Sequence, residues 1–128
     1  MKAQDLVAIY RADSLVKTLT EGIRTPTPHP FHVSQLHGSL DALLLAAVSK
    51  SFRGSHMVVM PDKEEAAYFL NDLQHLCGDK EVLFFPMSYK RPYEYDETEN
   101  ANILTRAEVL AELERREGVS GIAEKAAR

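Results

Sequence analysis

The stretch FHVSQLHGSLDALLLAAV, from Phe31 to Val48, joins a short apolar segment, a Gly-Ser turn and the start of an amphipathic pattern. Ser39 is a favourable N-cap residue, and Asp41 suits the positively polarised first turn of a helix. Apolar residues then recur at the i, i+3, i+4, i+7 and i+8 spacing of a helix with a broad buried face, namely Leu40, Leu43, Leu44, Ala47 and Val48. The stretch therefore predicts a strand, a turn and a helix, which is the layout of a phosphate-binding loop.

Two more apolar runs, HMVVMP (56–61) and EVLFFP (81–86), are typical of strands that are buried on both faces. Between them, Asp62 and Glu65 form a capping-box pattern, and Gly78 suits the end of the helix that follows. Strands that alternate with helices predict an α/β three-layer sandwich with a short, mainly parallel sheet. We expect a helicase-like subdomain with a degenerate P-loop, incomplete at its C-terminus, whose core contains Leu43, Leu44, Val58, Val59, Phe69, Leu70, Leu83 and Phe84.

Before Phe31, helical spacing on either side of Ala12–Ser14 predicts two short helices between Gln4 and Ile23, the second capped by Asp13 or Ser14. Prolines at 26, 28 and 30 then make a stiff connector. The last helix is expected to start near Glu99. We interpret the chain as a helical arm with a Pro-rich connector (1–30), an α/β subdomain (31–117) and a flexible tail or truncation (118–128), together a piece of a longer protein.

Composition excludes several classes of protein. The 128 residues carry a formal net charge of −4, so the chain as a whole has no basic field that would gather nucleic acid. Its single cysteine, Cys77, cannot form an internal disulfide, which excludes a disulfide scaffold. No apolar run approaches the roughly 20 residues that cross a membrane, so we expect no membrane partner and a cytoplasmic location.

The Gly38-Ser39 turn lacks the residues that a nucleotide requires. A working P-loop reads G-x-x-x-x-G-K-[ST], in which the lysine neutralises phosphate charge and the hydroxyl holds Mg²⁺. Here Leu40 follows Ser39, and no lysine lies between Val33 and Lys50. We therefore treat Gly38 and Ser39 as a degenerate loop and predict that this chain binds no ATP and no other cofactor.

Three other groups of residues contain side chains that could form chemical sites. The histidines at 29, 32 and 37 have no Cys or carboxylate at the spacing of a zinc site, so we expect no metal. Cys77 falls on the apolar face of its helix and is interpreted as a small buried hydrophobe rather than a nucleophile. The acidic run EYDETE (94–99) could form a paired-carboxylate or Mg²⁺ site, but we favour a solvated loop before a helix N-terminus. No catalytic residue is predicted.

The segment SYKRPYEY (88–95) offers the most distinctive surface, because cations alternate with aromatic rings. Such a combination of side chains is typical of surfaces that bind single-stranded nucleic acid or a protein partner. Packing of the tyrosines against the edge of their own domain is an alternative of equal weight. We expect contact mainly with the rest of a parent protein, with DNA secondary. The candidate partner-binding residues are Tyr89, Lys90, Arg91, Tyr93 and Tyr95.

The segments LHGSLDALLLAAV, HMVVMPDKEEAAYFLNDL and VLFFPMSYKRPYEYDETENANILTRAEVLAEL together resemble the N-terminal end of bacterial transcription-repair coupling factors. The resemblance is to the first subdomain of their UvrB-like module and covers about Phe31 to Arg116. Its most specific part is the strand ending FFP, the Pro-Tyr loop and a helix with Asn100, Asn102 and Arg106 early in it. UvrB proteins carry a longer tyrosine-rich hairpin that clamps DNA, where this chain has only SYKRPYEYDE.

The resemblance implies a parent protein that acts in DNA repair. Such factors recognise RNA polymerase stalled at DNA damage, release it with an ATP- and Mg-dependent DNA translocase, and recruit UvrA for nucleotide excision repair. The translocase motifs and the contacts with polymerase and UvrA lie outside these 128 residues, so none of those sites is assigned here. This chain would be a non-catalytic scaffold or docking subdomain that contacts other domains of its parent, and reaches RNA polymerase, UvrA and double-stranded DNA through that parent.

Two other interpretations stay open at this point. One is a small nucleotide- or phosphoryl-binding α/β enzyme of flavodoxin-like or P-loop type, and the other is a free-standing adaptor. The missing phosphate-cradling residues disfavour the enzyme.

Overall fold

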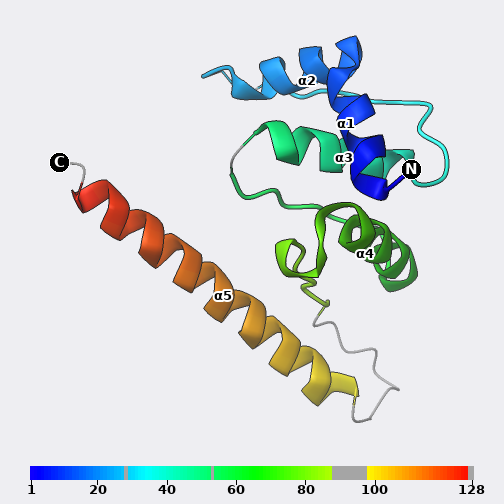
Figure 1. Cartoon of the computed structure of the whole chain (residues 1–128). Helices are drawn as coiled ribbons and strands as arrows, with labels where there is room; N and C mark the ends of the chain where they lie inside the picture. The colour runs from blue at the N-terminus through cyan, green and yellow to red at the C-terminus, as the bar shows by residue number, and fades with distance from the viewer. Residues whose placement is uncertain (28, 53, 88–97, 127–128) are drawn as a thin grey trace. The chain divides into compact units, whose positions relative to one another are not determined.

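The computed structural model describes residues 1–27, 29–52, 54–87 and 98–126. Within them the chain is helical, and Figure 1 shows the order of the elements. The chain divides into two compact units, Met1–Val82 and Leu83–Arg128. The helices are α1 (Ala3–Ala12), α2 (Ser14–Arg24), α3 (Leu40–Ser51), α4 (Lys63–Cys77), the short 3₁₀ helix η1 (Asp79–Glu81) and α5 (Thr98–Ala126).

The described residues contain no β-strand and no sheet, so the predicted α/β sandwich with a parallel sheet is wrong. The apolar run at 56–61 shows why this prediction fails. No backbone-to-backbone hydrogen bond joins residues 56–61 to any other described residue, and Val59 is 83 % exposed. Apolar and β-branched residues favour extended backbone, but a strand exists only where a second strand completes its hydrogen-bond ladder.

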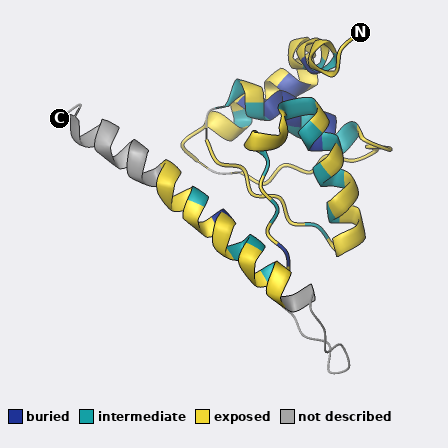
Figure 2. Cartoon of the chain, turned by 60° about the horizontal axis from the view of Figure 1, so that its bottom comes forward, coloured by how far each residue is buried: buried dark blue, intermediate teal, exposed yellow. Residues whose placement is uncertain are grey.

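The core of the first unit is built around α3, which contacts α1, α2 and α4 (Figure 1). Three alanines on α3 are completely buried: Ala42, Ala46 and Ala47. Because alanine is small, neighbouring helices can approach the α3 backbone closely on more than one side. The buried cluster consists of Val7, Val16, Ala42, Leu43, Ala46, Ala47, Val48 and Leu73, shown in dark blue in Figure 2.

The predicted core was therefore partly right. Leu43 is buried, and Leu44 and Phe69 pack against the cluster while partly exposed. Three of the four predicted core residues on the missing strands are instead exposed, namely Val58, Val59 and Leu83, at 42 %, 83 % and 38 %, and Phe84 is half-buried. In this unit the buried side chains are those at contacts between helices, so most side chains on the extended segments are not part of the core.

The predicted helix ends are confirmed where local chemistry decides them. Asp13 separates α1 from α2, and its Oδ1 accepts hydrogen bonds from the amides of Leu15 and Val16 at 2.8 and 3.3 Å. Asp62 Oδ1 accepts from the amide of Glu65 at 2.8 Å at the start of α4. Gly78 ends α4 with φ of 100°, a conformation that glycine adopts without strain.

The second unit consists of the segment from Leu83 and helix α5. Arg106 on α5 donates from Nη1 to the carbonyl oxygen of Pro86 at 2.8 Å, and its guanidinium carbon lies 4.2 Å from the centre of the Phe85 ring. The helix begins close to Glu99, as expected, and continues to Ala126 through the stretch that the sequence assigned to a tail. Among the described helices, α5 included, none has the length and apolar character that a membrane crossing requires.

Candidate functional site

The Gly38-Ser39 turn leads directly into α3. Gly38 has φ of +61°, and a Cβ built there would meet no atom within 4 Å, so the turn is open to solvent. Ser39 occupies the N-cap position, but its side chain makes no capping hydrogen bond. Its carbonyl oxygen accepts the amide of Leu43 at 3.0 Å, which starts the helix.

A carboxylate already occupies the first turn of α3. Asp41 Oδ1 accepts a hydrogen bond from the amide of Ala42 at 2.7 Å. Leu40, which follows Ser39, packs against the apolar cluster. A phosphate at this turn would therefore meet a negative charge, and neither Ser39 nor Leu40 supplies a cation to offset it.

The five candidates of the 88–95 segment, Tyr89, Lys90, Arg91, Tyr93 and Tyr95, lie outside the described residues, as does most of the acidic run at 94–99. Cys77 is half-buried and packs against the core, in agreement with its interpretation as a small hydrophobe. Within the described ranges, no three His, Cys, Asp or Glu side chains gather closely enough to hold a metal ion.

A different place in the structure brings charged side chains together, and sequence reasoning missed it. Arg11 at the end of α1 donates from Nε to the Ser51 hydroxyl oxygen at 3.2 Å. Arg24, the last residue of α2, donates from Nη2 to the Ser51 carbonyl oxygen. The Ser51 hydroxyl in turn donates to the carbonyl oxygen of Ala47 at 3.1 Å. Two helices are thus tied to the C-terminal end of a third through one serine.

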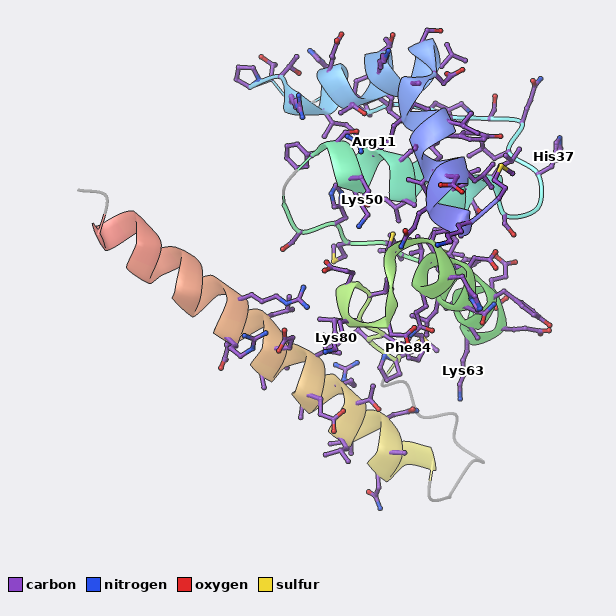
Figure 3. All side chains as sticks on the ribbon, in the orientation of Figure 1. Arg11, His37, Lys50, Lys63, Lys80 and Phe84 are labelled. Carbon is purple, nitrogen blue, oxygen red and sulfur yellow. The ribbon has the colours of Figure 1, made fainter. Side chains whose placement is uncertain are left out.

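We call Arg11, Arg24 and Ser51 the α3-end cluster. Arg11 is labelled beside α3 in Figure 3, and both arginines are exposed. No sequence signal marks the cluster, because its members are up to 40 positions apart and belong to no known motif. Only the packing of α1 and α2 on α3 brings them together.

Two ion pairs lie elsewhere, on the surface of α5. Arg115 Nη2 and Arg116 Nε lie 2.6 and 2.8 Å from Glu112 Oε1. Hydrogen bonds from Arg115 and then Arg116 lower the pKa of Glu112 from 4.5 to about 2. These residues are one helical turn apart, so the cluster is the ordinary surface pairing of a helix and suggests no site.

No family model, curated protein or solved structure matches this chain.

Proposed function

We propose that this chain is a non-catalytic docking part of a transcription-repair coupling factor. The ordered resemblance from about Phe31 to Arg116 supports the proposal. The described residues lack the sheet that the resemblance implies, so the fold lends no support to it. The inference that the chain is non-catalytic depends on the Gly38-Ser39 turn. There the Asp41 side chain accepts a hydrogen bond from the Ala42 amide, which a bound phosphate would need as a donor.

The exposed extended segments support a docking role. Met57, Val59 and Phe85 are 90 %, 83 % and 46 % exposed. Apolar side chains of this kind commonly mark contact surfaces with other proteins or domains. In the proposed parent these segments and the 88–95 segment contact neighbouring domains, while ATP, Mg²⁺, RNA polymerase, UvrA and double-stranded DNA are bound by other parts of that protein.

Disrupting the gene that encodes this chain tests the parent's role. After ultraviolet irradiation, repair of photoproducts is measured separately on the transcribed and non-transcribed strands of an active gene. The proposal predicts that the faster repair of the transcribed strand is lost and that the other strand is repaired at its usual rate. Restoring the gene should restore the difference, which controls for effects on neighbouring genes. A strand difference that survives disruption contradicts the proposal.

Nucleotide titration of the chain itself tests the non-catalytic part. The amide NMR signals of Gly38 and Ala42 are followed as Mg-ATP is added to millimolar concentration, so binding at this turn is separated from binding elsewhere. We expect no saturable change in either signal. Saturation of both at micromolar nucleotide would show a working phosphate loop and would favour a nucleotide-binding enzyme.

A further inference from the structure

Residues 56–60 show the side-chain alternation of a β-strand without a partner strand. Met57 and Val59 are 90 % and 83 % exposed, whereas Val58 is 42 % exposed and Met60 is half-buried. Successive side chains of a strand point to opposite faces, which produces such an alternation. Among the described residues, no backbone-to-backbone hydrogen bond involves this segment. Its backbone is therefore available for pairing with a second strand.

The other two extended apolar segments are already engaged within their own units. The Phe31 ring lies so close to Gly22 of α2 that an added Cβ there would collide with it. The carbonyl oxygen of Pro86 accepts a hydrogen bond from Arg106 at 2.8 Å. Of the three segments, 56–60 is therefore the most open to pairing.

The two ends of this segment carry opposite charges. The end of α3 precedes it and is basic, since Lys50 lies in the last turn and the two arginines of the α3-end cluster bond to Ser51. The start of α4 follows it and holds three carboxylates and one lysine: Asp62, Lys63, Glu64 and Glu65. Each group also suits the helix end at which it lies. Because residues 57–60 are uncharged, the segment is complementary to an antiparallel copy of itself.

We propose that residues 56–60 pair with the same residues of a second copy of this chain as antiparallel strands. The basic end of α3 in each copy then faces the acidic start of α4 in the other, and the ladder pairs backbone groups of both copies. The net charge of −4 per chain opposes this only weakly, because physiological salt screens charges beyond about 8 Å. The inference uses the first unit alone and does not depend on the proposed parent protein.

Pro61 determines which side of the strand pairs. Alternate residues of a strand direct their N–H groups to opposite sides, and proline has no N–H to donate. The side to which Pro61 belongs would lack a hydrogen bond, whereas the side to which Val58 belongs is complete. Pairing of the whole segment then places Val58 opposite Val58 of the second copy, and Met57 opposite its Val59.

Sedimentation equilibrium of the full chain at physiological salt tests the association. The interface is small, so we expect a dissociation constant on the order of 0.1–1 mM. The apparent mass should rise from that of one chain towards that of two across this range of concentration. The mass of a single chain at every concentration up to about 2 mM would overturn the proposal.

A mixture of isotope-labelled and unlabelled chains locates the interface by NMR. In a spectrum filtered for contacts between copies, Hα of Met57 should contact Hα of Val59, because these residues face each other across the pair. Within one extended chain the two protons are too far apart to give this signal. Filtered contacts from 56–60 to a different segment, or contacts that omit 56–60, would show another occupant and overturn the proposal.

Two valine-to-proline variants test the ladder. Val58→Pro removes one required N–H from each copy and should weaken association at least about tenfold. Val59→Pro is the matched control, since its N–H points away from the second copy, and the affinity should stay within about threefold. Circular dichroism checks that both variants keep their helices. Equal weakening by the two changes contradicts the proposed pairing.

Charge reversal tests the antiparallel orientation. Lys50→Glu and Glu64→Lys should each weaken self-association about threefold, because like charges then face each other. An equal mixture of the two variants should regain the affinity of the unchanged chain, since each altered end then meets the opposite charge. A mixture that associates no better than either variant alone would show that the two ends do not face each other.

Discussion

Replacing Ala46 with leucine distinguishes the helical core from the α/β arrangement that the sequence predicted. Ala46 lies outside the predicted apolar stripe of its helix, so an α/β subdomain would tolerate a larger side chain there. In the structure Ala46 has no exposed surface and lies in the cluster where α1, α2 and α4 contact α3. An isobutyl group in place of a methyl group then has no free space to occupy.

Overpacking of a closely packed core typically lowers the free energy of unfolding by about 1–3 kcal/mol. For a unit of this size, each kcal/mol corresponds to a fall of about 4–8 °C in the thermal midpoint. Circular dichroism at 222 nm measures that midpoint. The control is Ala67→Leu, an identical change at an exposed position of α4, which should shift the midpoint by no more than about 2 °C. Equal midpoints for the two variants would refute the packing described for α3.

Three further predictions concern a helix end, a carboxylate and the 88–95 segment. Asp62→Ala removes the cap of α4 and should lower the free energy of unfolding by about 1 kcal/mol, measured by urea titration; no change would show that the cap is dispensable. Glu112 should titrate near pH 2 by NMR. Because its pKa in the folded chain lies below 4.5, its contribution to stability is complete above pH 4.5 and is lost as pH falls through about 2. A titration midpoint near pH 4.5 would contradict the ion pairs. In the longer protein that we propose as the parent, Lys90→Ala/Arg91→Ala/Tyr93→Ala should speed proteolysis of the N-terminal part with little change in DNA affinity. Loss of DNA affinity alone would make the segment a nucleic-acid site.

Features set by neighbouring residues could be predicted from the sequence. The caps at Asp13 and Asp62 and the glycine at 78 depend on contacts within one helical turn, so residue type and spacing suffice. The two N-terminal helices followed from their apolar spacing for the same reason.

Features that need distant partners could not be predicted in this way. The run at 56–61 has the composition of a buried strand, but pairing depends on another segment that the run itself does not specify. The burial of Ala42 and Ala46 was missed because a stripe of large apolar residues marks one helix face, whereas α3 is packed on several. The α3-end cluster was missed because Arg11 and Arg24 meet Ser51 only after three helices have packed together.

The central structural claim is that the apolar segments 32–36, 57–60 and 82–86 form no strand and that most of their side chains are exposed. NMR measurement of backbone nuclear Overhauser effects between these segments tests it most directly. Antiparallel pairing gives short Hα–Hα contacts, and parallel pairing gives short contacts from amide H to Hα. We expect helical chemical shifts across α1 to α5 and neither kind of contact among the three segments. A regular series of either kind between any two of them would show a sheet and contradict the helical account.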